Sequence, residues 1–336
     1  MARRVSALVL GSLLALLTLE AVSRWYFNYQ SVRDPVLGSV VAAGHTFRSR
    51  IEGSGIAYHE DHGIRRSPAL GPRRGLRIAC LGDSFTEANQ VSDDEVYTTV
   101  TERALVSSGM PACLLNMGRS GLSVADYVAN AEAFRERTAA AWAVVQIHDR
   151  DLGPEAWQTS KTHFRRPCAT CPLEVVRIPP PPDGRARRVL RWLRNQSALL
   201  GFAMERGQEL AGARAPGAAS AVAETPAAYH IVKAQLRMLA DAYNGRLTIL
   251  LIGRFDPADP GRDTAGEATI RRAACELGIS LAYSRDEYGA LADRGTAPFG
   301  FPNSSLNSGH LNASGHAAAA RALTRALLAL HAEGRL

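Results

Sequence analysis

The sequence predicts an α/β fold, a three-layer sandwich in which helices cover both faces of a central parallel sheet of about five strands. Short apolar runs alternate with longer stretches whose apolar residues lie three and four positions apart. The short runs are typical of strands buried on both faces, and the spacing is typical of helices packed on a sheet. A length of 336 residues, with 46% apolar and 21% charged residues, suits one large globular domain or two small ones.

The individual elements follow from this alternation. The predicted strands are 77–81, 112–115, 143–147, 247–252 and 279–282, and the predicted helices are 97–107, 124–141, 228–243, 264–277 and 317–330. Ligands of such sheets bind at the carboxyl ends of the strands. Side chains that directly follow a predicted strand are therefore the first candidates for a functional site.

The N-terminal segment 1–27 is predicted to enter a membrane. Arg3 and Arg4 precede the uncharged apolar run 5–19, as in a signal peptide or a signal-anchor. Trp25 and Tyr26 resemble interfacial anchors and favour an uncleaved signal-anchor, whereas 21–23 is a weak cleavage site. In either case the charged start stays inside and the bulk of the chain is exported.

Segment 28–75 is a predicted N-terminal lead-in, followed by a domain over 76–332 with a helical, basic insertion at about 153–227. Within the lead-in, His59, Asp61 and His62 resemble a metal cluster, but local spacing alone is weak evidence and favours a solvated loop. The insertion contains a basic amphipathic helix over 185–210. It is either a lid or membrane-contacting arm, or a helix packed on the sheet.

The net charge limits the expected binding partners, and the cysteines indicate the redox state of the domain. The net charge is +7, which favours anionic surfaces such as phospholipid head groups or acidic polysaccharide. Because no nucleic-acid motif is present, nucleic acid is not an expected partner. Cys168 and Cys171 form a CxxC that favours a local disulfide in an exported domain. Neither a cofactor nor a metal is expected.

Two motifs carry the chemistry. Gly82, Asp83 and Ser84 follow the first strand, and His310 lies within Gly-His-Leu-Asn just before the last helix. The tripeptide alone is better explained by a helix N-cap. A serine early and a histidine late in the chain are also what a spatially assembled acyl-transfer pair requires.

Taken together, the two motifs resemble the SGNH, or GDSL-like, hydrolase family over about 74–332. The resemblance implies the flavodoxin-like SGNH hydrolase fold. It also implies that Ser84 is the nucleophile, with its own N–H as an oxyanion donor, and that His310 is the general base. Gly118 matches the glycine that supplies a second oxyanion donor.

Two positions depart from the family pattern. Arg150 stands in the slot of the asparagine that completes the oxyanion hole, where it either replaces the donor or pairs outward with an aspartate. His148 is another residue able to reach the site. Asn307 stands where the family has the aspartate that orients the histidine, and Asn303 is a further candidate. An asparagine carbonyl can still hold the histidine tautomer but carries no charge, so slower turnover is expected.

The resulting prediction is an exported serine esterase or acyl-transfer enzyme. It would lie in the bacterial inner membrane, with its catalytic domain on the periplasmic side, and act on an O-acyl ester of an envelope carbohydrate or lipid. The alternative, motivated by the two departures, is a catalytically degenerate module that binds or helps modify envelope polysaccharide. A weaker third hypothesis is a metal-dependent hydrolase that uses the histidines of the lead-in.

Overall fold

The computed structural model describes the chain except residues 1, 154–161, 169–170, 180–181, 183 and 213–224. Its centre is a parallel sheet of five strands in the order β11-β10-β7-β5-β6. The strands are β5 (Leu76–Leu81), β6 (Ala112–Asn116), β7 (Trp142–Ile147), β10 (Leu247–Leu251) and β11 (Ser280–Tyr283). The predicted fold class is confirmed, and each predicted strand is found within two residues of its expected bounds.

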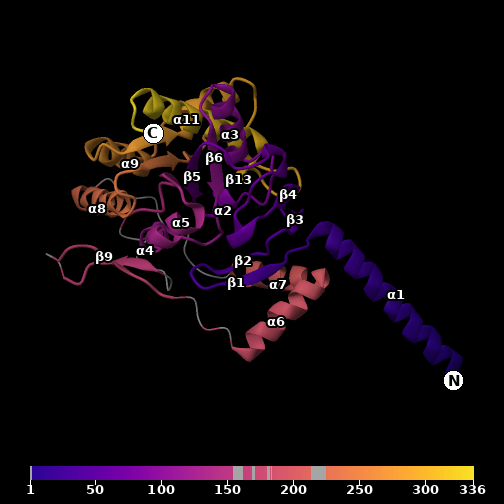
Figure 1. Ribbon diagram of the computed structural model, residues 1–336. Helices are drawn as coiled ribbons and strands as arrows, with labels where there is room; N and C mark the ends of the chain where they lie inside the picture. Colours follow the sequence, from indigo (N-terminus) through magenta and orange to yellow (C-terminus); the bar gives the residue numbers. More distant parts are fainter. Residues whose placement is uncertain (1, 154–161, 169–170, 180–181, 183, 213–224) are drawn as a thin grey trace.

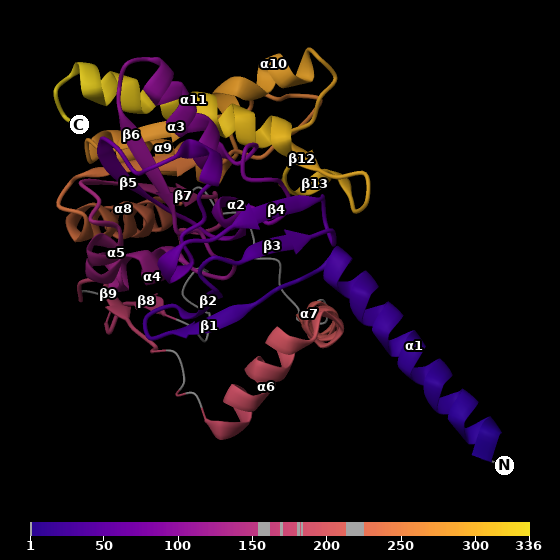
Figure 2. The ribbon, with the colours of Figure 1, turned by 45° about the vertical axis from the view of Figure 1, so that its right-hand side comes forward.

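Helices cover both faces of this sheet (Figures 1 and 2). One face packs on α4 (Val124–Ala129), α5 (Ala131–Thr138), α8 (Pro226–Ala242) and α9 (Ala265–Glu276). The other packs on α3 (Tyr97–Ser107), α10 (Tyr288–Ala292) and α11 (Ala313–Ala332). Each interface is a continuous apolar core, which leaves the carboxyl edge of the sheet as the place for polar chemistry.

Two predicted helices are each broken into a pair. The stretch 124–141 forms α4 and α5 because Asn130, at φ −116° and ψ 15°, ends one helix and begins the next. The basic stretch 185–210 forms α6 (Arg185–Gln196) and α7 (Ala198–Gly212), with Ser197 in an extended conformation between them. Asparagine and serine bond readily to nearby backbone groups, which makes them common residues at helix boundaries.

Short hairpins and turns complete the molecule. The lead-in forms β1 (Ser31–Asp34) with β2 (Gly38–Val41), and β3 (Thr46–Ser49) with β4 (Gly55–Tyr58). Further pairs are β8 (His163–Arg165) with β9 (Glu174–Val176), and β12 (Phe299–Gly300) with β13 (Leu306–Leu311). The 3-10 turns are Asp61–Gly63, Pro68–Leu70 and Ser284–Glu287. Cys168 and Cys171 are joined by a disulfide, as expected.

The lead-in is part of the folded body, and the prediction of a solvated loop at residues 59–65 holds only for its exposed turn at Asp61 and His62, because His59, Ile64 and Arg65 are buried. Arg65 is buried, donates from Nε to Asp93 over 2.8 Å, and donates from its terminal nitrogens to the carbonyls of Glu87, Ala88 and Val91. These carbonyls follow α2 (Ser84–Glu87) or end it. Arg65 therefore fixes the far end of the single helical turn that carries Ser84.

The residues of the metal hypothesis do not form a cluster. His59 is buried, whereas Asp61 and His62 are exposed. Within the described part of the chain, no group of three His, Cys, Asp or Glu side chains is arranged to hold a metal ion. The structure therefore gives no support to a metal site in the lead-in.

The N-terminal helix α1 (Ala2–Tyr26) projects away from the body (Figure 1). Residues Arg3–Tyr26 are long and apolar enough to cross a membrane, with a mean hydropathy of 2.1, and none of this segment's most apolar window is buried. An apolar helix exposed all round suits a membrane anchor or a signal sequence.

Candidate active site

Ser84 is the first residue of α2, at the carboxyl edge of the central sheet. The side chain of Asp83 caps the helix by accepting from the Phe85 N–H over 2.9 Å, as the capping interpretation predicts. Gly82 allows this tight turn, since a Cβ there would lie 2.0 Å from Thr86 Oγ1 and 2.6 Å from Gln146 Oε1. The turn leaves the hydroxyl of Ser84 free to face a neighbouring group.

That group is His310. Its Nε2 lies 2.9 Å from Ser84 Oγ, although the two residues are 226 positions apart in the sequence. His310 is in β13, three residues before Ala313, the first residue of α11. The structure thus brings together the two residues that the motifs identified, at the distance that proton transfer requires.

The other ring nitrogen of His310 is bonded to Glu52. Nδ1 lies 2.5 Å from Glu52 Oε2, and the backbone N–H of His310 donates to Glu52 Oε1 over 3.1 Å. Burial favours a higher pKa for Glu52, but hydrogen bonds and charge from His310, with a further bond from Gln90, hold that pKa below its usual value. An ionised carboxylate on Nδ1 places the ring proton there and leaves Nε2 as the acceptor.

The assignment of the histidine-orienting position to Asn307 was therefore wrong. Asn307 is exposed and has a φ of 63°, which fits the bend of β13 rather than a contact with the ring. No sequence motif marks Glu52, which lies in a loop of the lead-in 258 positions before His310. Such a contact is set by tertiary packing alone.

Asn303, the further candidate for orienting His310, instead bonds to the loop that carries Glu52. Its Oδ1 accepts from the Gly53 N–H over 2.9 Å, and its Nδ2 donates to the carbonyls of Gly53 and Arg50 over 2.8 and 3.2 Å. These three bonds hold the loop that carries Glu52. Asn303 is therefore a positioning residue for the acidic partner of His310.

The oxyanion donors are only partly as expected. The N–H of Ser84 has no hydrogen-bond partner in the described part of the chain, so it is available to a ligand. The N–H of Gly118, by contrast, donates to Asn116 Oδ1 over 2.9 Å. A Cβ on Gly118 would lie 2.3 Å from the Glu87 nitrogen. The structure thus explains Gly118 by close packing on α2, and its predicted role as an oxyanion donor receives no support.

At the end of β7, His148 rather than Arg150 approaches the site. The ring of His148 lies 4.1 Å from that of Phe85, whose ring is 5.1 Å from His310. Arg150 is exposed and has no partner among the described residues. The predicted donor role of Arg150 therefore receives no support. Its alternative partner Asp149 is instead paired with Arg254 over 3.1 Å.

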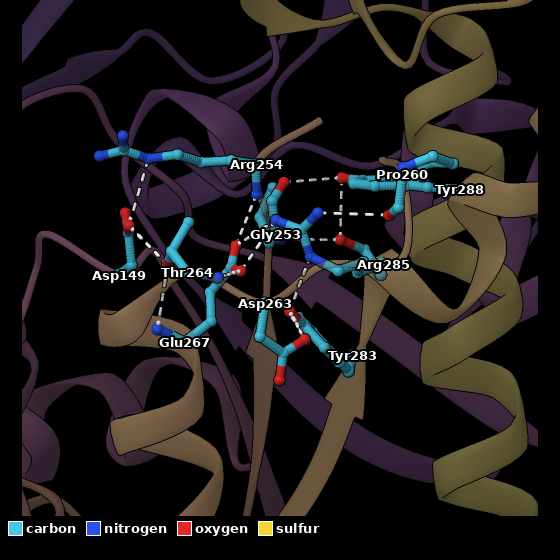
Figure 3. A network of polar contacts seen from close by, with 12 residues as sticks. Asp149, Gly253, Arg254, Pro260, Asp263, Thr264, Glu267, Tyr283, Arg285 and Tyr288 are labelled. Carbon is cyan, nitrogen blue, oxygen red and sulfur yellow. Dashed lines mark hydrogen bonds and ion pairs between the residues drawn. The ribbon is translucent and has the colours of Figure 1, made fainter. Parts of the chain in front are cut away.

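His148 is held by the loop after β10. Its Nδ1 lies 3.2 Å from the carbonyl of Ile252, which can only accept, so the neutral ring carries its proton on Nδ1. Its Nε2 is buried without a partner in the described structure. The polar contacts of Figure 3 fix this loop: Glu267 accepts from the Arg254 N–H over 2.6 Å and pairs with Arg285.

A cavity of about 380 Å³ adjoins the catalytic pair. Its lining includes Glu52 and His310 together with Tyr29, Arg119 and Arg194. Aromatic rings, arginines and amides together provide both stacking and hydrogen bonds, which is the mixture that a polar ligand with an apolar face requires. The site is thus accessible and has room for a substrate.

Comparisons with known proteins find only distant similarity. No protein-family model matches the sequence, and no curated protein is detectably similar to it. One similar solved structure is a member of the lipolytic protein G-D-S-L family from Veillonella parvula. That structure shares 11% identity at a TM-score of 0.38, covering 75% of this chain and 97% of its own.

Two further structures show the same level of similarity. TesA shares 13% identity at a TM-score of 0.39, with 75% of this chain and 98% of its own covered. The acetylxylan esterase Axe2 from Geobacillus stearothermophilus shares 15% identity at 0.40, with 76% and 94% covered. Similarity this distant does not transfer an activity or a substrate, so function must be argued from the site itself.

Proposed function

We propose that this protein is a serine esterase or acyl-transfer enzyme of the SGNH/GDSL type. The observation that carries the proposal is the continuous hydrogen-bonded series Glu52–His310–Ser84, with distances of 2.5 and 2.9 Å. A carboxylate, an imidazole and a hydroxyl in this order are what nucleophilic acyl transfer requires. The N–H of Ser84 supplies a donor beside the nucleophile.

The proposed reaction has two half-reactions. Ser84 Oγ attacks the ester carbonyl while His310 Nε2 takes the hydroxyl proton, and the resulting oxyanion accepts from the Ser84 N–H. The C–O bond to the leaving alcohol then breaks as His310 returns the proton to that alcohol. In the second half-reaction His310 deprotonates water or an acceptor hydroxyl, which attacks the acyl-Ser84 carbonyl; the bond from that carbonyl carbon to Ser84 Oγ then breaks as His310 returns the proton to Oγ, releasing the acid or the acylated acceptor.

The ionised Glu52 contributes in both halves. It holds the proton on His310 Nδ1 and stabilises the imidazolium that forms when Nε2 is protonated. The lack of such a charge was one of the two reasons for the degenerate-module alternative. With Glu52 in contact with His310, that reason falls away, and the enzyme hypothesis is favoured.

The proposed substrate is an O-acyl ester of an envelope carbohydrate or lipid, reached from a membrane anchor. The apolar helix α1 and the arginine-rich composition support a location at an anionic membrane surface, with the catalytic domain on the periplasmic side. The aromatic and arginine side chains that line the cavity support a polar or anionic substrate.

Covalent labelling tests the proposal. A fluorophosphonate probe is expected to modify the purified full-length protein at Ser84, and short p-nitrophenyl esters are expected to be hydrolysed. Ser84→Ala should abolish both, whereas Ser120→Ala, at an exposed serine that lines the cavity, should retain labelling. If the wild type is neither labelled nor active on esters, and donor-dependent acylation of a glycan also fails, the proposal is wrong.

A further inference from the structure

Helix α6 is amphipathic, but its apolar side is exposed instead of being packed on the body of the protein. Helical spacing places four apolar residues on one side and Arg187, Arg191, Arg194 and Asn195 on the opposite side. The apolar residues are all exposed, at 52% for Val189, 44% for Leu190, 60% for Trp192 and 41% for Leu193. An exposed apolar face of this size marks a surface that something else covers.

The polar side of α6 is the side that contacts the body. Asn195 exchanges two hydrogen bonds with the backbone of Ser31, at 3.0 and 2.9 Å. The guanidinium of Arg194 lies 4.3 Å from the ring centre of Tyr29. The helix is therefore held by its polar residues, and its apolar residues are directed outward.

The same region is joined to the end of α1. Glu20 accepts from Ser197 Oγ and from the N–H groups of Ala198 and Leu199, at 2.8, 2.8 and 3.1 Å. Arg24 donates to the carbonyl of Gln196 over 2.6 Å. The junction between α6 and α7 is thus fixed to the last two turns of the apolar helix.

This attachment sets the level of α6 relative to a membrane. The apolar run 5–19 is about 22 Å long at 1.5 Å per residue, shorter than the hydrocarbon core of about 30 Å, so the contacts from Glu20 to Tyr26 fall near the membrane boundary. In both views of the ribbon, α6 runs crosswise to α1 from this junction (Figures 1 and 2). A helix crosswise to a spanning helix, at its boundary, lies along the membrane surface.

We propose that α6 is an interfacial helix that buries its apolar face in the anionic membrane that α1 spans. Trp192 and the three aliphatic residues enter the boundary region, and Arg185 and Arg188 at the edge of the face meet lipid phosphates. The segment has five arginines and no acidic residue, so its charge complements an anionic surface. The inference rests on the proposed anchor role of α1.

One consequence concerns access to the site. Arg194 of α6 and Tyr29 line the cavity that also contains Glu52 and His310. An interfacial α6 therefore places one wall of this cavity beside the membrane surface. A substrate attached to a lipid would reach the site without leaving the membrane.

Spin labels on the full-length protein in phosphatidylethanolamine–phosphatidylglycerol liposomes test the inference. Val189→Cys and Arg187→Cys, each with Cys275→Ser, place labels on opposite sides of α6. The Val189 label is expected to collide several-fold more with oxygen, which dissolves in lipid, than with an aqueous nickel complex. The Arg187 label and a label on native Cys275, which is exposed on α9, should show the opposite preference.

The outcomes show whether lipid, water or a protein surface covers the apolar face of α6. If the Val189 label is as accessible to nickel as the Arg187 label, the helix is not in the membrane. If it is shielded from both agents, a protein surface covers it, and the inference is also wrong. Flotation and alkali extraction of the same liposomes test the anchor independently. A protein that is extracted by alkali refutes the anchor, whereas one that resists extraction but has a water-accessible Val189 label refutes only the role of α6.

The charge is tested separately. Arg185→Glu with Arg188→Glu should reduce the oxygen preference of the Val189 label several-fold in the anionic liposomes. Equal immersion of this variant and the parent would overturn the anionic part of the proposal.

Discussion

Replacing Glu52 by glutamine tests the acidic member of the site with almost no change in shape. The two carboxylate oxygens have different partners: Oε2 faces His310 Nδ1, and Oε1 accepts from the His310 backbone N–H. Glutamine has only one acceptor oxygen. If it accepts from Nδ1, its NH₂ group faces a backbone N–H, and two donors are opposed.

The reverse orientation is worse for catalysis. The amide would then donate to Nδ1 and shift the ring proton to Nε2, which could no longer accept the proton of Ser84. An aspartate-to-asparagine change in a serine protease triad costs about 10⁴ in kcat through this tautomer. We expect Glu52→Gln to lower kcat by about 10³–10⁴, which is about 4–5.5 kcal/mol in the barrier.

The assay is steady-state hydrolysis of p-nitrophenyl acetate by the full-length protein, with the rate of fluorophosphonate labelling as a second readout. KM should change little, since Glu52 acts on His310 rather than on the ester. Asn307→Gly is the matched control because glycine accepts the positive φ of that position. It should retain wild-type activity within a few-fold. A large loss in Asn307→Gly, or an activity within a few-fold of wild type in Glu52→Gln, would refute the assignment.

Three further predictions concern Arg65, Asn303 and His316. Arg65→Lys replaces four hydrogen bonds of the guanidinium by at most three from a single ammonium, so it should lower the free energy of unfolding by about 1–3 kcal/mol in denaturant titrations, and kcat with it. Asn303→Ala releases the Glu52 loop and should lower kcat about 10–100-fold, with Ser84 still reactive toward a fluorophosphonate at a reduced rate. Burial, with the nearby charges of Arg65 and His310, lowers the pKa of His316 to about 3, so the unfolded chain binds a proton below pH 6.5 that the folded chain excludes. Stability should therefore be full above pH 6.5 and fall as the pH is lowered, and between pH 7 and 5 His316→Asn should lose about 2 kcal/mol less than wild type in urea titrations. An unchanged pH dependence in that variant would contradict the depressed pKa.

The fold was predictable because the signals for it are local. Each central strand is a short apolar run, and the boundary at Gly82 to Ser84 is a strand-to-helix turn with its own cap. His310 was also predictable, since it lies in a recognisable motif at the start of the last helix. Local periodicity, caps and motifs depend on neighbouring residues, so they can be read from the chain directly.

Glu52 could not be found in this way. It follows a hairpin strand in the lead-in, without a motif, and reaches His310 only because that lead-in packs across the edge of the sheet. The same packing buries Arg65 behind α2. A departure from a family pattern at one position, here Asn307, therefore shows that the local partner is missing. It does not show that the function is lost, because another segment can supply the carboxylate to the same nitrogen.

The orientation of α6 exposes a second limit of sequence patterns. The amphipathic spacing of its residues is evident from the sequence, and it fits equally a helix packed on the sheet or one on a membrane. Only the contacts separate the two cases, because Asn195 and Arg194 attach the polar side to the body and leave Val189 and Trp192 exposed. Periodicity predicts that a helix has two faces. Which face is buried depends on what the rest of the chain presents to it, and here the rest of the chain presents hydrogen-bond partners.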